Sequence, residues 1–481
     1  MAGSRFRELD CIFYPKSIAV VGVSPDKQTV GNSYAAGLLA AGFAGNIYPV
    51  NPKGGEFQGL KIYPSLAAIP YPVDYVIVSI PKQSVLQLLD ECIVKRVKAV
   101  QFFTAGFREE DAISGYKLEQ EMLGKARQGG FRIIGPNCVG IYSPEARIPL
   151  GPLAILGSAG KVGFLCQSGG IAEKVAELGI SRGINYSKGV SLGNGVDLDG
   201  SDFLEYLTAD SKTQVIGAYL EGIKDGHHFF HVLKDATTVK PVIVLKGGRT
   251  NVSAKAALSH TGSLTTRAAI WTTLLKQAGA IEVYSVEELT DSLLLFQQLE
   301  GYAGGNRVAF ISGLAGGGGG VCVSATDACI EFGLHVPLLS AKTQQELKAT
   351  CGSVGTILHN PVDIGPRGWS EPQILRKVLE IIAADPVIDL IMVHEDIYRF
   401  RKIGVPWEMV KKFNEVIIEI KQNKSIVIVL PHGVTDEARK EIDQMLCRAK
   451  IAVFPTSERA AKAIFNLSQY FPYHKSQDFN Y

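Results

Sequence analysis

The chain has 481 residues, of which 46% are hydrophobic and 20% charged, and its formal net charge is only +2. A chain of this length is too long for one hydrophobic core and favours about three domains. Its 49 basic and 47 acidic side chains nearly cancel, which argues against nucleic acid or a membrane surface as the main partner, so any affinity for phosphate must be local.

The cysteines and the N-terminal residues predict a cytoplasmic protein. The eight cysteines include no Cys-x-x-Cys pair and show no framework spacing, so we expect neither a disulfide scaffold nor a structural metal site. Residues 1–8 lack the apolar core of a signal peptide, and no apolar run approaches the length that spans a bilayer. We therefore expect a protein of the reducing cytoplasm, without a membrane segment.

Short β-branched runs alternate with helical patterns along the chain, which is typical of doubly wound α/β domains with parallel sheets. A stretch that contains proline and glycine, residues 144–160, interrupts this rhythm and predicts a first domain over residues 1–145. Within that domain a Rossmann-like sheet is predicted from runs at residues 17–22, 46–50, 75–79, 99–103 and 131–134.

The loop after the first run lacks the Gly-x-Gly-x-x-Gly fingerprint of dinucleotide-binding domains. Gly22 and Gly31 frame a longer loop that ends at a helix N-terminus, where a phosphate can bind. After the second run, Lys53 stands where a carboxylate would hold the ribose of NAD. This exchange disfavours NAD and suits a ligand with an extra ribose phosphate, such as coenzyme A (CoA) or NADP. The alternative, that the glycines only form turns, stays open.

Polar residues follow the strands of a second predicted domain, residues 158–300. The segment from Gln167 to Gly170 follows one strand candidate and opens a helix, so its free amides and the helix dipole favour an anion. Glu221 stands at the C-terminal tip of the run at residues 215–220, where functional side chains of α/β sheets project. It can orient a histidine ring, although such a carboxylate is often only solvated.

The apolar run at residues 241–245 leads into a loop that contains the Ser-His-Thr-Gly motif at residues 259–262. Lys246, Arg249 and Lys255 give this loop three cations and no carboxylate, which favours an anion such as phosphate. The imidazole of His260 is a competent phosphoryl acceptor, and an exposed, movable loop suits a carrier. The alternative is an inert, solvated histidine.

A glycine-rich break at residues 300–306 precedes five further strand candidates. They predict a third domain over residues 305–472 and a polar tail over residues 473–481. Five consecutive glycines, residues 316–320, predict a second helix N-terminus for an anion, or else a flexible turn. Neither this segment nor the one at residues 167–170 is a Walker loop, because no Gly-Lys-Ser/Thr follows either of them. The His-Glu-Asp sequence at another strand end, residues 394–396, we interpret as structural.

Eight motifs stand out, at residues 47–53, 104–107, 135–140, 167–170, 191–194, 219–222, 259–262 and 360–363. Jointly they resemble the ADP-forming acyl-CoA synthetases, the acetate–CoA ligase branch of the succinyl-CoA synthetase superfamily, over most of the chain. The resemblance implies an α/β chain with a Rossmann-like CoA-binding domain followed by two flavodoxin-like (succinyl-CoA synthetase-like) doubly wound domains.

The resemblance also implies roles for particular residues. His260 is phosphorylated and Glu221 steadies it, and no metal ligand is implied. Paired helix N-termini hold the phosphate, through Gln167, Ser168, Gly169, Gly170, Gly317, Gly318 and Gly319. The CoA site comprises Gly22, Ser24, Gly31, Asn51, Pro52, Lys53, Ile80, Pro81, Thr104 and Asn137.

The family's nucleotide site lies in an ATP-grasp domain, and nothing in the 481 residues is left to build one. We therefore expect Mg-ADP or Mg-ATP on a partner ATP-grasp β subunit, and a hetero-oligomer. The leading hypothesis is an α-type subunit that interconverts acyl-CoA, phosphate and ADP with a carboxylic acid, CoA and ATP through an acyl phosphate and a phosphohistidine. The alternatives are a non-catalytic CoA-binding or regulatory subunit and, weakened by the missing fingerprint, an NADP-dependent dehydrogenase.

Overall fold

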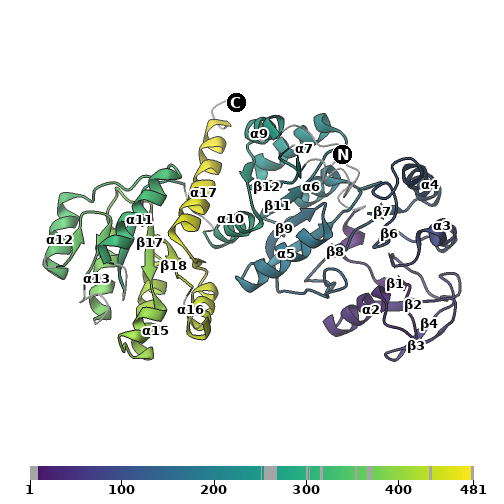
Figure 1. The fold of residues 1–481 in the computed structure, drawn as a ribbon, viewed down its shortest axis with the longest axis horizontal. Helices are drawn as coiled ribbons and strands as arrows, with labels where there is room; N and C mark the ends of the chain where they lie inside the picture. The colour runs from purple at the N-terminus through teal and green to yellow at the C-terminus, as the bar shows by residue number, and fades with distance from the viewer. Residues whose placement is uncertain are drawn as a thin grey trace. The chain divides into compact units, whose positions relative to one another are not determined.

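The computed structural model describes residues 9–250, 252–253, 268–299, 302, 304–314, 318–352, 355–365, 371–432 and 436–477. The chain divides into two compact units, Met1–Leu289 and Thr290–Tyr481. Three sheets of mainly parallel strands, with helices packed on them, make up these units (Figure 1). The expected α/β fold class is confirmed. None of the helices in the described ranges is long and apolar enough to cross a membrane.

The first sheet has five parallel strands in the order β2-β1-β5-β6-β7. Alternate residues of β1 enter cores on opposite faces of the sheet: Ile18 packs into one core and Ala19 into the other. Its strands are β1 (Ser17–Val21), β2 (Asn46–Val50), β5 (Tyr75–Val78), β6 (Ala99–Phe102) and β7 (Arg132–Ile134), its helices α2 (Val30–Ala41), α3 (Val85–Lys95) and α4 (Ser114–Gly129), and β3 (Gly55–Phe57) and β4 (Leu60–Ile62) form a hairpin.

The second sheet, in the order β13-β12-β11-β9-β10-β8, belongs to the same unit. Strand β8 (Gly140–Tyr142), which lies within the predicted first domain of residues 1–145, pairs antiparallel with β10. The parallel strands are β9 (Ala159–Cys166), β10 (Tyr186–Ser191), β11 (Val215–Leu220), β12 (Val242–Lys246) and β13 (Ile281–Val283), with helices α5 (Gly169–Ser181), α6 (Gly200–Ala209), α7 (Gly226–Val239), α9 (Ala268–Ala278) and α10 (Val286–Gln298).

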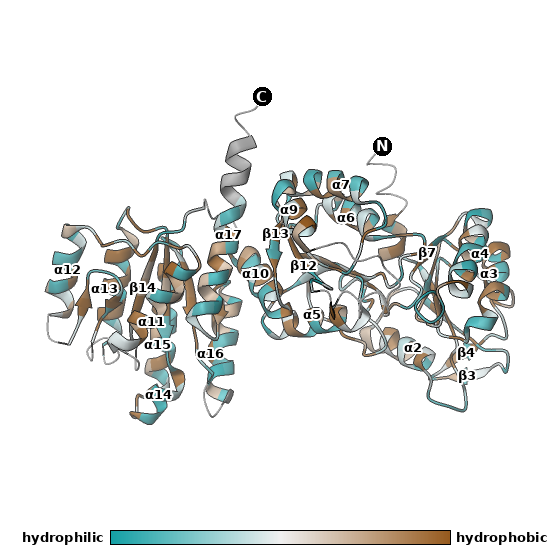
Figure 2. Cartoon of the chain, turned by 45° about the horizontal axis from the view of Figure 1, so that its top comes forward, coloured by the Kyte–Doolittle hydropathy of each residue, from teal (hydrophilic) through white to brown (hydrophobic). Residues whose placement is uncertain are grey.

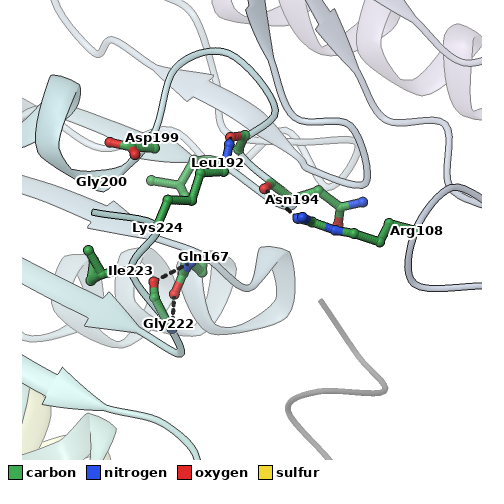
Figure 3. Close-up of a pocket in the computed structure, with 10 residues that line it drawn as sticks. Arg108, Gln167, Leu192, Asn194, Asp199, Gly200, Gly222, Ile223 and Lys224 are labelled. Atoms are coloured by element: carbon green, nitrogen blue, oxygen red, sulfur yellow. Dashed lines mark hydrogen bonds between the residues drawn. The ribbon is translucent and has the colours of Figure 1, made fainter. Parts of the chain in front are cut away.

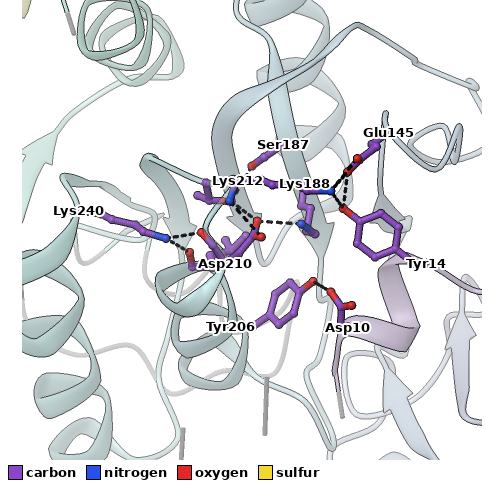
Figure 4. A network of polar contacts seen from close by, with 11 residues as sticks. Asp10, Tyr14, Glu145, Ser187, Lys188, Tyr206, Asp210, Lys212 and Lys240 are labelled. Carbon is purple, nitrogen blue, oxygen red and sulfur yellow. Dashed lines mark hydrogen bonds and ion pairs between the residues drawn. The ribbon is translucent and has the colours of Figure 1, made fainter. Parts of the chain in front are cut away.

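A polar network lies at the amino edge of the second sheet (Figure 4). Lys188 in β10 forms a buried ion pair with Asp210 after α6, at 2.8 Å between Nζ and Oδ2. The Lys240 ammonium donates to the main-chain oxygens of Leu207 and Asp210 at 2.8 and 2.6 Å. Burial lowers the pKa of Lys240 to about 8, because desolvation disfavours its charged form. The parallel strands begin at this edge, so the network lies opposite the edge where their carboxyl ends meet.

The third sheet, in the second unit, has the order β15-β16-β14-β17-β18-β19. Its strands are mainly apolar, and its helices carry hydrophilic outer faces (Figure 2). The strands are β14 (Val308–Leu314), β15 (Ile357–Leu358), β16 (Val362–Asp363), β17 (Leu390–Glu395), β18 (Ser425–Val429) and β19 (Ala452–Phe454), and the helices are α11 (Gly318–Glu331), α12 (Ala341–Cys351), α13 (Pro372–Ala383), α14 (Ile397–Lys402), α15 (Trp407–Ile420), α16 (Asp436–Arg448) and α17 (Ser457–Gln477).

Helix α17 continues past residue 472, where the sequence predicted a polar tail. The division into domains at residues 145, 158, 300 and 305 stays a prediction. In the core of this unit Glu395 is fully buried and accepts a hydrogen bond from Asn414 Nδ2 at 2.9 Å. Desolvation raises the pKa of Glu395 to about 8. Residues 394–396 thus include a neutral buried carboxyl near pH 7, in keeping with a structural interpretation.

Candidate functional site

The residues predicted to bind CoA lie at one edge of the first sheet. Every strand of this sheet is parallel to its neighbours, so all the carboxyl ends meet at the same edge. The chain runs from β1 to β2 on one side and then returns to β5 on the other side of β1. The carboxyl edge at such a reversal of strand order is where open α/β sheets bind ligands. The residues that follow the strand ends are Gly22, Ser24, Asn51, Pro52, Lys53, Ile80, Pro81, Thr104 and Asn137, and Gly31 lies in α2.

Close packing requires glycine both after β1, at Gly22, and in the first turn of α2, at Gly31. Gly22 has φ +108°, and a Cβ there would lie 2.5 Å from the main-chain oxygen of Ser79. A Cβ on Gly31 would lie 2.6 Å from the carbonyl of Gly22. Thr29 caps α2, since its hydroxyl accepts from the main-chain nitrogen of Asn32 at 3.2 Å. The two glycines therefore allow the start of α2 to pack directly against the end of β1.

Lys53 reaches from the β2 end to this loop. Its ammonium lies 3.1 Å from Asp26 Oδ2, and its main-chain nitrogen donates to Asn51 Oδ1 at 3.0 Å. The paired side chains of Lys53 and Asp26 are 66% and 61% exposed. An ion pair as exposed as this contributes about 1 kcal/mol or less. A ligand phosphate can therefore take the place of Asp26 at little cost.

In the second sheet, Gln167 and Ser168 link the start of α5 to the end of β11. Ser168 caps α5 by accepting from the main-chain nitrogen of Ile171 at 3.4 Å. The Gln167 amide donates to the Gly222 oxygen and accepts from the Gly222 nitrogen, both at 2.9 Å, and it also accepts from the Glu221 nitrogen. The side chain of Gln167 therefore positions the segment that carries Glu221, and its contact with phosphate stays a prediction.

Glu221 is 4% exposed and lies beside the start of the segment that leads to the Ser-His-Thr-Gly motif. Tyr219 donates to Glu221 Oε1 at 3.1 Å, and Lys246 Nζ donates to the Glu221 main-chain oxygen at 2.8 Å. A Cβ on Gly247 would lie 2.4 Å from the Tyr219 hydroxyl oxygen and 3.1 Å from Glu221 Cγ. The chain that leaves β12 therefore passes directly against the Glu221 side chain.

Two of the three cations predicted for the loop after β12, Lys246 and Arg249, contact residues of the second sheet's domain. Lys246 is 1% exposed, so the expectation that it belongs to an exposed loop is wrong. Desolvation lowers its pKa to about 8. The Arg249 guanidinium stacks 4.6 Å from the centre of the Tyr284 ring and donates to the Tyr284 oxygen at 3.1 Å. Lys255 and His260 lie outside the described residues, so the role of His260 stays a prediction.

In the second unit, a carboxylate lies at the N-terminus of α11. A Cβ on Gly313 would lie 2.8 Å from Asp363 Oδ1, and a Cβ on Gly318 would lie 3.2 Å from Asp363 Oδ2. Asp363 thus faces the positive end of the helix dipole, and the glycines give it room. Gly318 and Gly319 begin α11 as expected, whereas Gly317 lies outside the described residues. The pairing of this helix with α5 around one phosphate stays a prediction.

Arg108, Asn194 and Lys224 have no predicted role, although Asn194 ends the motif at residues 191–194. With Gln167 and Gly222 they line a pocket of about 180 Å³ in the first unit (Figure 3). All three follow the carboxyl ends of strands, namely β6, β10 and β11. Their place after strand ends is the signal that also identified Glu221, but Arg108 lies six residues beyond β6, and no strand was predicted before Asn194.

Comparisons with known proteins agree with this arrangement. A CoA binding domain model matches residues 16–144, and a model of the succinyl-CoA ligase like flavodoxin domain matches residues 159–296. The alpha subunit of acetate–CoA ligase [ADP-forming] I from Pyrococcus furiosus is 34% identical over 95% of this chain and 96% of its own length. Acetate–CoA ligase [ADP-forming] I from Archaeoglobus fulgidus is 37% identical over 80% of this chain, but the match spans only 54% of that relative.

A solved structure is similar over the full length. The dinucleotide forming acetyl-coenzyme A synthetase 1 of Ca. Korarchaeum cryptofilum, in complex with phosphate and ADP, matches with a TM-score of 0.84 at 31% identity, covering 98% of both chains. The near-complete match to an α subunit and this structural likeness agree with the motifs. The chain therefore belongs to the family of ADP-forming acyl-CoA synthetases, as a chain of the α-subunit type.

Proposed function

We propose that this chain is the α-type subunit of an ADP-forming acyl-CoA synthetase, which interconverts acyl-CoA, phosphate and ADP with a carboxylic acid, CoA and ATP. The observation that carries the proposal is the buried Glu221 carboxylate, which lies against Gly247 where the chain sets out toward His260. A non-catalytic CoA-binding or regulatory subunit is the second candidate. The intact pair of Glu221 and the Ser-His-Thr-Gly motif favours the enzyme.

CoA is expected at the carboxyl edge of the first sheet. The close packing of Gly31 on Gly22 brings the start of α2 near the strand end, where its amides suit the CoA diphosphate. Lys53, released from its exposed pair with Asp26, suits the ribose phosphate. The remaining predicted contacts are Ser24, Asn51, Pro52, Ile80, Pro81, Thr104 and Asn137.

The first chemical step is expected to form an acyl phosphate. A phosphate oxygen attacks the thioester carbonyl carbon, the carbon–sulfur bond breaks, and CoA leaves as the thiolate, which takes up a proton. The N-terminus of α5, opened by Ser168, Gly169 and Gly170, supplies amides and a dipole that favour the phosphate anion. Gln167 keeps the Glu221 segment at this site.

The second step is expected to move the phosphoryl group to the chain. A ring nitrogen of His260 attacks phosphorus, the bond from phosphorus to the acyl oxygen breaks, and the carboxylate leaves. Glu221 accepts a hydrogen bond from the other ring nitrogen, which fixes the tautomer and stabilises the charge that develops. The loop then carries the phosphoryl group to Mg-ADP on a partner ATP-grasp β subunit, where ADP takes it to form ATP. We expect this hetero-oligomer to act in the cytoplasm.

Reconstitution tests this proposal. The tagged chain is purified from its source, co-purifying chains are identified by mass spectrometry, and ATP formation from acyl-CoA, phosphate and ADP is measured with and without the partner. We expect an ATP-grasp chain in the eluate, ATP only when both chains are present, and none with His260→Asn. ATP formation by the single chain would show that the domain content is misassigned, and full activity of His260→Asn would exclude the phosphohistidine.

A further inference from the structure

The pocket in Figure 3 lies next to the segment that carries Glu221, and no step above uses its cations. Four loops of the first unit line it, and they follow β6, β9, β10 and β11. Its volume of about 180 Å³ is below the roughly 300–1,000 Å³ of pockets that hold a drug-sized ligand. It therefore suits a small group of a few non-hydrogen atoms rather than a nucleotide.

Two cations approach this pocket from opposite sides of Asn194 (Figure 3). Lys224 Nζ donates to the main-chain oxygens of Gly195 and Val196, the latter at 3.2 Å. Arg108 donates to the Asn194 main-chain oxygen at 3.4 Å, and its buried Nε makes no hydrogen bond within the described part of the chain. A guanidinium carries five N–H donors, so Arg108 retains donors for a ligand.

The neighbouring carboxylates already have partners. The Asn194 side-chain nitrogen donates to Glu109 Oε2 at 2.7 Å and to Glu119 Oε1 at 2.8 Å. Asp199 caps α6 through a capping box and accepts from the Ser201 nitrogen at 2.8 Å. These acids therefore organise the loops around the pocket. Glu119 also forms an ion pair with Arg108, and its nearest oxygen lies 3.7 Å from Arg108 Nε, too far for a hydrogen bond.

Asn194 adds an acceptor without a partner. The residue is 3% exposed, and its Oδ1 makes no hydrogen bond to any described residue. Its orientation is fixed, because its side-chain nitrogen must face the two glutamate oxygens. A buried acceptor left unpaired costs about 1–3 kcal/mol, which a ligand hydroxyl can recover. The pocket thus offers cationic donors and one acceptor around a small space.

We propose, on the basis of the proposed function, that this pocket receives the distal end of the acyl group and favours acyl groups that carry an oxygen there, a hydroxyl or a carboxylate, over plain alkyl groups. Leu192 and Ile223 line the pocket as well and contact the carbon chain. Lys224 and Arg108 donate to the distal oxygen, and Asn194 Oδ1 accepts from a hydroxyl. Lys224 is then a specificity-determining residue.

The test uses butyryl-CoA, 4-hydroxybutyryl-CoA and succinyl-CoA, which share a four-carbon acyl chain and differ at its distal end. The full chain is mixed with each thioester and phosphate, and the rate of CoA release is followed by chromatography of quenched samples, since the eight free thiols of the chain would react with thiol reagents. We expect the wild type to favour one or both oxygen-bearing thioesters over butyryl-CoA by at least about tenfold.

Lys224→Met should reduce this preference on the order of tenfold, and Lys224→Arg should restore part of it. Lys234→Met, at an exposed position of α7, is the matched control and should leave all three rates unchanged. If Lys224→Met lowers the rate of CoA release equally for all three thioesters, Lys224 has a general structural role and the proposal is overturned. The same holds if the KM for phosphate rises equally with each thioester, which would show a phosphate-binding role.

Failure of the proposed function looks different. If the wild type releases CoA from all three thioesters at equal rates, the pocket assignment fails and the proposed function stands. If no thioester releases CoA although the chain binds CoA in a thermal-shift assay, both the proposed function and the pocket assignment fail.

Discussion

Replacement of Lys188 by Met should destabilise the first unit far more than replacement of Lys212 by Met. The Lys188 and Asp210 side chains are 1% and 5% exposed, with Nζ and Oδ2 2.8 Å apart. Burial raises the pKa of Asp210, but hydrogen bonds from Lys188 and Thr213 outweigh this effect and hold its pKa below the ordinary value. Lys188→Met would therefore leave a buried carboxylate without its cation.

Removal of one member of a buried ion pair lowers the free energy of unfolding by about 3–5 kcal/mol. For a folding unit of this size, each kcal/mol corresponds to roughly 2–4 °C in Tm, so we expect a drop of about 6–20 °C. Differential scanning calorimetry at pH 7 measures this change. Lys188→Met/Asp210→Asn should recover part of the loss, because the uncompensated charge is removed.

Lys212 provides the matched control. It pairs with Glu145 in the same network, but the two side chains are 50% and 44% exposed. Such a pair contributes about 0–1 kcal/mol, so Lys212→Met should shift Tm by no more than about 4 °C. Equal shifts for Lys188→Met and Lys212→Met would refute the reasoning from burial.

Three further predictions concern the site and the second unit. Lys53→Ala should weaken CoA on the order of tenfold and dephospho-CoA little, by calorimetry; equal losses would remove its phosphate contact. Glu221→Gln should bind CoA normally and lower phosphorylation by about 100-fold; full phosphorylation would leave Glu221 without a role. Glu395 has a folded pKa of about 8, so only the unfolded state ionises between about pH 4.3 and 8, and stability falls there as pH rises by up to about 1.4 kcal/mol per unit. The free energy of unfolding of Glu395→Gln, measured with urea, should lack this fall. If the variant and the wild type showed the same pH dependence, Glu395 would not be a neutral carboxyl in the folded state.

Many strands could be predicted from the sequence because they are buried on both faces. All residues of β1 and β5 are buried, so each strand appears as an uninterrupted apolar run. Strand β10 is equally buried but was not predicted, because its Ser, Lys and Gly residues break the apolar run. Strand β8 was missed as part of the second sheet, since it has three residues and its partner β10 begins at Tyr186. A pairing so short and so distant leaves no periodic signal.

Side-chain placement at the site could be predicted only in part. Glu221 was found because it follows a clear strand directly. The sequence predicts Lys246 as a loop cation, because it does not show that the Lys246 ammonium donates to the Glu221 main-chain oxygen. Arg108 and Asn194 meet only through tertiary contacts between the loops after β6 and β10. The glycine pattern also does not show that the Asp363 carboxylate lies beside Gly313 and Gly318, because this contact joins segments far apart in the sequence.

The central claim is that His260 carries the phosphoryl group, and direct mapping of the label tests it. The full chain is incubated with [32P]phosphate and, in parallel, acetyl-CoA, 4-hydroxybutyryl-CoA or succinyl-CoA, without nucleotide or partner, then digested and analysed by mass spectrometry. We expect an acid-labile, base-stable label on His260 that disappears in His260→Asn and persists in His231→Asn, a change on exposed α7. Label on Ser259, or label that persists in His260→Asn, would contradict the account.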